Sequence, residues 1–157
     1  MFMSGINVDI SEIKKELGLL AGKKVSHVWR GHGTYASLEV GEIHEKEVDS
    51  PKGKYLMKEG DWTLALDGDW KMYKGDGEIA DSVNDDLKVL DFKLQLLKDL
   101  TIKSINLSDD KKSASIFFDK DLAITARSAE YGFISTKNYE RKRSLVFEPT
   151  GEVKIES

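Results

Sequence analysis

The sequence predicts an α+β protein of two related halves, each a helix followed by an antiparallel β-meander. Three observations support this fold class. Two segments carry apolar residues at helical spacing, the remaining segments are short and rich in β-branched and aromatic residues, and parts of the first half align with parts of the second. With 157 residues the chain is long enough for one domain, so we expect a single domain over residues 1–157.

The first helix is predicted to begin after Asp9, which can cap it while Glu12 completes a capping-box pattern. Gly18 or Gly22 is expected to end it. Its apolar face consists of Ile10, Ile13, Leu17 and Leu20. The second helix is predicted to follow a similar pair, Ser82 and Asp85. Its core-facing stripe consists of Val83, Leu87, Leu90, Leu94 and Leu97, widened by Phe92 and Leu96.

Strands are predicted from β-branched and aromatic runs bounded by turn residues. In the first half they lie near residues 24–30, 34–43, 54–58, 62–66 and 70–73, and in the second near 101–107, 113–118, 121–126, 131–135, 143–147 and 152–156. Asp67-Gly68 predicts a two-residue hairpin, because both residues tolerate positive φ. Residues 58–61 predict another turn, and residues 108–111, 119–120 and 149–151 predict three more.

The internal repeat aligns residues 20–28 with 97–105, and residues 36–40 with 114–118. Both halves end with a similar tripeptide, Gly-Glu-Ile at residues 77–79 and Gly-Glu-Val at residues 151–153. This match predicts repeat units of approximately 6–81 and 82–157. Val25 and Val28 break strict alternation at the same place as Ile102 and Ile105. This spacing predicts a β-bulge or a bend in each half.

Composition narrows the range of functions. The chain has no cysteine, so disulfide scaffolds, cysteine zinc sites and thiol nucleophiles are excluded. Its first residues have neither a basic segment nor a continuous apolar one, so we expect no secretory signal. The apolar runs are far shorter than the ~20 residues that a spanning helix needs. We therefore expect a cytoplasmic protein without a membrane partner.

No recognised catalytic or ligand-binding motif is present. His27, His32 and His44 lack metal-ligand spacing, and Asp67-Gly68-Asp69 fails as a calcium loop, since the next ligand position holds Lys71. The Gly-x-Gly pairs at residues 31–33 and 75–77 do not precede a helix, as a phosphate-binding loop would require. We expect no cofactor, no metal and no catalytic residue, although a site with His27 or His32 beside a carboxylate stays an alternative.

Charge is uneven along the chain, whose net charge is −4. Residues 39–91 hold 15 Asp and Glu against 7 Lys. Such a stretch favours basic partners and repels nucleic acid. The basic cluster at residues 137–143 is more typical of a solvated hairpin tip than of a nucleic-acid site. Trp29, Trp62 and Trp70 all fall in the first half, where they can serve as core residues or as interface anchors.

Residues 20–25, and Gly60-Asp61 leading into Trp62, resemble small bacterial immunity proteins of toxin systems, as do the size, charge and repeat pattern. This resemblance implies a non-catalytic protein-binding or inhibitory module that neutralises a basic bacterial toxin. The partner-binding residues would then be Glu42, Glu45, Glu47, Asp49, Tyr55, Glu59, Asp61 and Trp62. A small-ligand-binding domain and an undetected enzyme are the alternatives.

Overall fold

The computed structural model describes residues 6–7, 9–128, 134–140, 143–148 and 150–156. The helices are α1 (Ile10–Gly18), α2 (Leu87–Leu94) and the short 3₁₀ helix η1 (Gln95–Leu97). The strands of the first half are β1 (Ile6–Asn7), β2 (Val25–Arg30), β3 (Ala36–Ser50), β4 (Gly53–Leu66), β5 (Asp69–Lys74) and β6 (Gly77–Asp81). Those of the second half are β7 (Ile102–Leu107), β8 (Ser113–Phe118), β9 (Leu122–Arg127), β10 (Ile134–Asn138), β11 (Arg143–Phe147) and β12 (Val153–Glu156).

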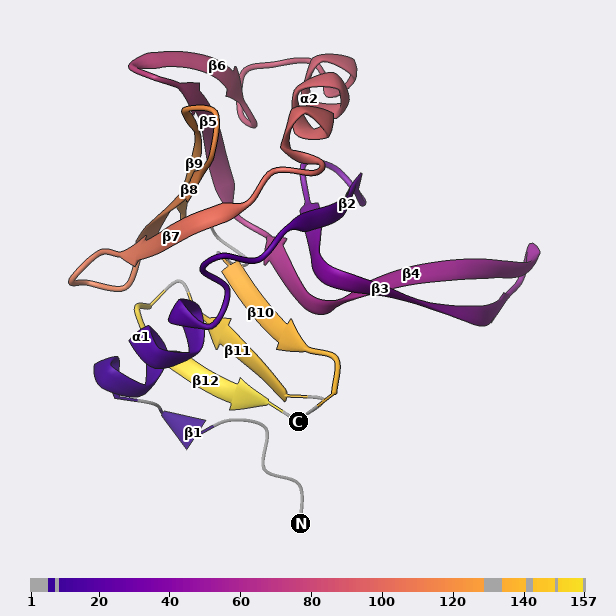
Figure 1. Ribbon diagram of the computed structural model, residues 1–157, viewed down its shortest axis with the longest axis horizontal. Coiled ribbons are helices and arrows are strands. Elements are labelled where there is room, and N and C mark those ends of the chain that lie inside the picture. Colours follow the sequence, from indigo (N-terminus) through magenta and orange to yellow (C-terminus); the bar gives the residue numbers. More distant parts are fainter. Residues whose placement is uncertain (1–5, 8, 129–133, 141–142, 149, 157) are drawn as a thin grey trace.

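The strands form two antiparallel sheets, and the two halves of the chain exchange strands between them. The larger sheet has the order β1-β12-β11-β10-β4-β3-β2, and the smaller has the order β6-β5-β9-β8-β7. After β4 the chain crosses to the smaller sheet, where β5 pairs with β9; after β9 it crosses back, and β10 pairs with β4. Figure 1 shows the two sheets meeting near the centre of the molecule. Each sheet therefore contains strands from both halves.

The first hairpin of each half has the same register. In β2 and β3, Val28 lies opposite Leu38, and a register shift follows Val25. In β7 and β8, Ile105 lies opposite Ile116, and a register shift follows Ile102. The irregularity predicted from the sequence spacing is therefore present in both hairpins.

The starts of these two hairpins lie against each other, and their hydrogen bonds are reciprocal. The Gly22 N–H donates to Ile102 O, and the Asp99 N–H donates to Val25 O, each at 2.7 Å. Asp99 stands in the second half where Gly22 stands in the first, and both have positive φ, at 72° and 84°. Such pairing is what a local two-fold arrangement would produce.

Helix α1 forms as predicted, because Asp9 caps it by accepting a hydrogen bond from the Glu12 N–H. Helix α2 differs at its N-terminus. It begins at Leu87 instead of near Ser82, because Ser82 Oγ accepts a bond from the Trp70 N–H and Asp85 accepts one from the Asp81 N–H. Both side chains are thus occupied in holding the turn after β6.

The apolar stripe predicted for the second helix is buried only in part. Leu90, Leu94 and Leu97 are fully buried, whereas Val83 and Leu87 are exposed, as are Phe92 and Leu96. The exposed residues lie before the helix begins or on its outer side. Helix α2 packs against β2 and β6, and α1 lies against β7.

Three details of the predicted strands are corrected. Asp67-Gly68 does not close a hairpin, because it connects β4 and β5, which belong to different sheets, and neither residue has positive φ. Residues 58–61 are not a turn but part of the continuous strand β4. Residues 77–81 form β6, which pairs with β5. Of the predicted strand 131–135 only residues 134 and 135 are described, and Pro149, in the predicted turn 149–151, lies outside the described residues.

The core fills the space between the sheets and helices. Its largest fully buried side chains include Trp70, Phe147, Leu38, Leu64 and Met72. Among the described residues, no helix is both long and apolar enough to cross a membrane.

Candidate functional site

The most prominent surface feature is a two-stranded arm formed by residues 41–60, the outer parts of β3 and β4. Figure 1 shows these strands continuing together well beyond the rest of their sheet. They pair from Ile43 opposite Gly60 to Ser50 opposite Gly53. By comparison, β8 and β9 are joined by residues 119–121 alone. The hairpin of β3 and β4 therefore extends much farther from its sheet than the hairpin of β8 and β9 does.

The arm carries five of the eight predicted partner-binding residues on its surface. They are Glu42, Glu45, Glu47, Asp49 and Tyr55, and all are exposed. The other three differ. Glu59 is buried and lies 3.2 Å from Lys137 Nζ, Trp62 is only 5% exposed, and Asp61 is occupied by hydrogen bonds. Trp62 and Glu59 therefore belong to the folded base of the arm and offer little surface to a partner.

Charge on the arm is nearly balanced, contrary to what the acidic middle of the sequence suggests. Residues 42–59 hold five acidic residues against four lysines, whereas residues 61–91 hold nine against three. Across the arm, Glu45 lies opposite Lys58 and Asp49 opposite Lys54, and Lys54 also forms an ion pair with Glu47. The acid excess therefore lies in the region of β5, β6 and the start of α2.

A groove of about 390 Å³ lies between the arm and the edge strand β2. It is lined by His27, Trp29, Tyr55, Leu56, Met57 and Lys58. His27 and Trp29 come from β2, and the others from the arm portion of β4. Leu56 is 63% exposed and Tyr55 51%, and Trp29 and Met57 are also exposed. Large apolar residues from two elements thus line one open concavity.

Glu39 holds the indole wall of this groove in place. Its carboxylate is 2% exposed and accepts hydrogen bonds from Trp29 Nε1 at 3.1 Å and from Ser37 Oγ at 2.6 Å. Thr63 Oγ1 and the Gly60 N–H donate to its other oxygen. A buried carboxylate with four donors is well satisfied. Glu39 therefore fixes the ring of Trp29 and the backbone at the base of the arm together.

Two glycines allow the arm to leave the sheet at its base. Gly41 has φ +84°, and a Cβ there would lie 2.7 Å from Asp61 Oδ2. A Cβ on Gly60 would lie 2.5 Å from Val40 N and 2.6 Å from Val40 O, atoms that cannot move aside. The register between β3 and β4 shifts at the same point, between Val40 and Ile43. These positions require glycine, and together they set the direction of the arm.

Asp61 and His44 form the other half of this base. Asp61 Oδ2 accepts from the Glu42 N–H at 3.0 Å, and Asp61 Oδ1 lies 2.7 Å from His44 Nε2. The His44 ring stacks on Tyr139, with centroids 4.0 Å apart, and the Tyr139 N–H donates to Asp61 O. The hydrogen bond from His44 is the main reason that the pKa of Asp61 is lowered. These contacts tie the arm to the end of β10.

The three histidines occupy three different places. His27 lines the groove, where burial lowers its pKa and the charge of Lys58 lowers it further. His44 is bound to Asp61 at the base of the arm. His32 lies in the turn between β2 and β3. In the part of the chain that the structure describes, no three His, Asp or Glu side chains are grouped to hold a metal ion.

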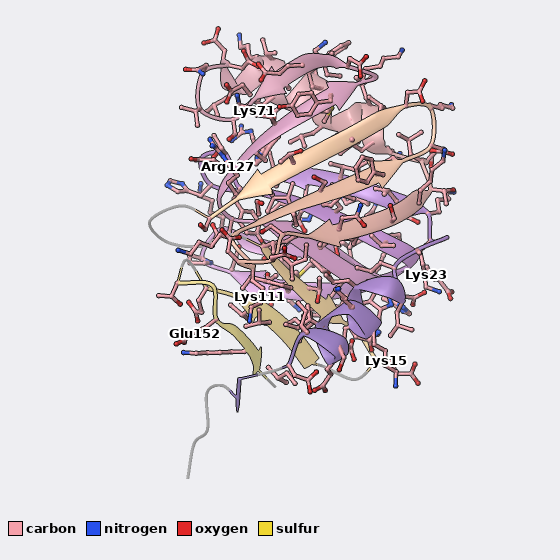
Figure 2. The ribbon with its side chains drawn as sticks, turned by 90° about the vertical axis from the view of Figure 1, so that its left-hand side faces the viewer. Lys15, Lys23, Lys71, Lys111, Arg127 and Glu152 are labelled. Atoms are coloured by element: carbon pink, nitrogen blue, oxygen red, sulfur yellow. The ribbon has the colours of Figure 1, made fainter. Side chains whose placement is uncertain are left out.

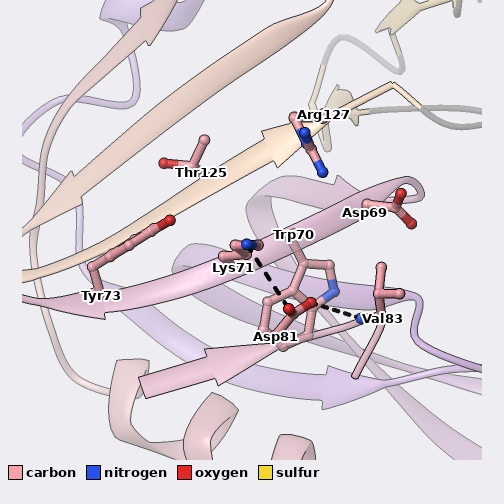
Figure 3. A pocket seen from close by; sticks show the side chains of 8 residues that line it. All are labelled: Asp69, Trp70, Lys71, Tyr73, Asp81, Val83, Thr125 and Arg127. Carbon is pink, nitrogen blue, oxygen red and sulfur yellow. Dashed lines mark hydrogen bonds and ion pairs between the residues drawn. The ribbon is translucent and has the colours of Figure 1, made fainter. Parts of the chain in front are cut away.

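A second, smaller hollow of about 150 Å³ lies on the side of the five-stranded sheet, where Lys71 and Arg127 are seen in Figure 2. Figure 3 shows Lys71, Thr125 and Arg127 along it, and Trp70 is also among its lining residues. Lys71 lies 3.1 Å from Glu78 and 3.9 Å from Asp81, and these carboxylates raise its pKa. The charge of Lys71 is therefore already balanced by two carboxylates, and the hollow is smaller than the groove.

Sequence reasoning found Tyr55 but missed His27, Trp29, Leu56, Met57 and Lys58 as one site. A signal was present, because Tyr55, Leu56 and Met57 are three consecutive apolar residues between two lysines. On a two-stranded ribbon, consecutive side chains point to opposite sides, so such a run must leave apolar surface uncovered. The role of Trp29 depends on how the arm folds, which no local pattern indicates. Arg141 and Lys142 of the predicted basic cluster lie outside the described residues.

No protein-family model, no curated protein and no solved structure matches the chain.

Proposed function

We propose that this protein is a non-catalytic protein-binding module that engages its partner through the arm and the groove beneath it. One observation carries the proposal: four large apolar residues, Trp29 from β2 and Tyr55, Leu56 and Met57 from the arm, line a groove of about 390 Å³. Exposed clusters of Trp, Tyr, Leu and Met are typical of interface anchor sites. The rigid base, fixed by Glu39 and Asp61, supports it further because a preorganised surface loses less entropy on binding.

A toxin-immunity role is the specific form of this proposal. It draws on the resemblance in sequence and on the acid excess of residues 61–91, which would speed encounter with a basic toxin. In this form the acidic region governs the approach, and the groove supplies the final packing. Glu42, Glu45, Glu47 and Asp49 then contribute as exposed acids on the arm, each lying near the contact.

The experiment uses the full chain as bait, identifies the captured protein by mass spectrometry, and measures its binding kinetics with two variants. Leu56→Asn removes an apolar side chain from the groove, and Val83→Asn is its matched control, since both residues are 63% exposed. We expect Leu56→Asn to speed dissociation at least about tenfold and Val83→Asn to leave it unchanged. Equal effects of the two substitutions would contradict a site at the groove.

Charge reversal separates encounter from packing. The triple variant Glu42→Lys, Glu45→Lys and Glu47→Lys should slow association and reduce its dependence on salt, with little change in dissociation. If the captured protein is a toxin, its activity is also measured with and without the wild-type chain. The wild-type chain should abolish that activity. Capture of a partner whose binding ignores all these variants would overturn the proposal.

Binding of a small apolar ligand is the second candidate. The volume of the groove, about 390 Å³, falls within the range of about 300–1,000 Å³ that small-molecule sites occupy. Its lining, mostly apolar with one imidazole and one ammonium group, also suits such a ligand. A ligand that co-purifies with the wild-type chain but not with the Leu56→Asn variant would favour this candidate.

We also propose that the two halves derive from one repeated unit. The matched registers of β2–β3 and β7–β8 support this, as do the reciprocal hydrogen bonds at Gly22 and Asp99. The arm would then be an insertion into the first unit. A binding function acquired by the first unit would account for an arm in that unit alone.

A further inference from the structure

The charge at the groove is opposite in sign to that of the whole protein. Lys58 lines the groove and is exposed, and among the described residues no carboxylate lies within ion-pair distance of its Nζ. Its cross-strand neighbour Glu45 shares its face of the arm without forming an ion pair. Burial lowers the pKa of the His27 imidazole and the charge of Lys58 lowers it further, whereas the charge of Glu39 acts in the opposite direction. Lys58 thus supplies the ammonium group that lines the groove.

The nearby carboxylate of Glu39 lies behind the wall of the groove, where a ligand does not contact it. It is 2% exposed, and its two oxygens accept four hydrogen bonds from neutral donors. Trp29 lies between it and the groove, because the indole N–H donates to Glu39 while the ring forms the wall. A ligand in the groove therefore contacts an apolar surface and the Lys58 ammonium.

The rest of the lining requires an apolar group. Trp29, Tyr55, Leu56 and Met57 present aromatic, aliphatic and thioether surface, and each is at least 36% exposed. Removing this surface from water favours binding. An apolar side chain is thus favoured in the groove, and a carboxylate next to it would reach the Lys58 ammonium.

We propose that the groove takes a segment of the partner protein in which a Leu or Phe side chain stands next to an Asp or Glu. The inference rests on the proposed function, because it describes the segment that the binding module would hold. It implies that a partner that is basic overall presents a locally acidic, apolar segment to this site. The arm then distinguishes partners by this segment, while the acid excess of residues 61–91 acts only on their approach.

The test uses three capped peptides with the central sequences Glu-Leu-Phe, Gln-Leu-Phe and Lys-Leu-Phe. Binding is followed by the fluorescence of Trp29 and by ¹H–¹⁵N shifts of residues 55–58; Trp62 and Trp70 are buried and contribute a constant background. We expect the Glu peptide to bind with Kd on the order of 0.1–1 mM, a value typical of a short unconstrained segment. The Gln peptide should bind several-fold more weakly, and the Lys peptide most weakly.

Charge variants identify the group responsible. Lys58→Glu should weaken binding of the Glu peptide about three- to tenfold and strengthen binding of the Lys peptide. Lys52→Glu, the same change at the tip of the arm, should alter the binding of neither peptide. Glu45→Gln should strengthen the Glu peptide, because it removes the negative charge opposite Lys58. Thermal melts establish that the variants stay folded.

Two results would overturn the inference. One is equal binding of the three peptides, and the other is an absence of shifts in residues 55–58 at millimolar peptide. Either result leaves the proposed function to its own test, the effect of Leu56→Asn on the captured partner. If that substitution has no effect while the Glu peptide binds as expected, the groove is a peptide site and the proposed partner contact is wrong.

Discussion

Asp61 joins the arm to the rest of the larger sheet through His44, whose Nε2 lies 2.7 Å from Asp61 Oδ1. This contact gives the stability a specific pH dependence. The hydrogen bond from His44 lowers the pKa of Asp61 below its usual 3.8, with a further contribution from the Glu42 N–H. Stability from the ionised carboxylate is therefore complete above pH 3.8 and is lost as the pH falls through the lowered value.

Asp61→Asn tests this dependence by urea unfolding between about pH 2.5 and pH 6. We expect the variant to be less stable than the wild type at the upper end and the difference to shrink in acid. Asp76→Asn changes an exposed carboxylate in the turn between β5 and β6. This control variant should have the same unfolding free energy as the wild type at every pH. A difference for Asp61→Asn that does not change with pH would show that the ionised carboxylate makes no net contribution.

Gly60→Ala should disrupt the base of the arm. The added Cβ would meet the backbone of Val40 at 2.5 Å, and backbone atoms of a paired strand cannot shift aside. We expect a loss of about 1–3 kcal/mol or more in unfolding free energy, measured by thermal melting. Gly18→Ala is the control, because nothing lies within 4 Å of its Cβ position. A Gly60→Ala protein with the melting temperature of the wild type would contradict the close packing of Gly60 against Val40.

Leu90→Ala should leave a cavity in the core and cost about 2–5 kcal/mol, because Leu90 is fully buried on the inner side of α2. Phe92→Ala, two residues along the same helix, should change stability by less than about 0.5 kcal/mol, since its side chain is 68% exposed. Chemical denaturation of both variants measures the contrast. Comparable losses would mean that the outer side of α2 is covered in solution.

Glu39→Gln should affect both stability and the groove. An amide cannot accept all four hydrogen bonds that the carboxylate accepts, so at least one buried donor loses its partner. We expect a cost of about 1–3 kcal/mol and a change in Trp29 fluorescence, since the indole N–H donates to Glu39. Ser113→Ala, a hydroxyl removed from the other sheet, serves as the control. An unchanged fluorescence spectrum would show that Glu39 does not fix the indole.

Local patterns predicted the local structure well. The cap at Asp9 and the bulges after Val25 and Ile102 depend on residues close in sequence, so their signals are readable without tertiary information. The Asp67-Gly68 prediction was wrong for the opposite reason. A turn sequence shows that the chain changes direction there, but the strand that β5 then pairs with, β9, lies more than 50 residues away.

Contacts between distant segments also decide which of the predicted site residues are exposed. Glu42, Glu45 and Tyr55 are exposed because a two-stranded ribbon has no layer above it. Trp62, just past the bend at Gly60, turns into the core instead. The groove itself depends on the angle between the arm and β2, which Gly41, Gly60 and Asp61 set through contacts between distant segments.

The strand exchange determines what would happen if the chain were divided between β6 and α2. The N-terminal fragment would keep β4 without β10 and β5 without β9, and the C-terminal fragment would have the complementary open edges. Neither fragment could complete a sheet by itself, but the two together could complete both. The protein is thus a natural candidate for a split reporter, in which the groove is built entirely from residues of the N-terminal fragment.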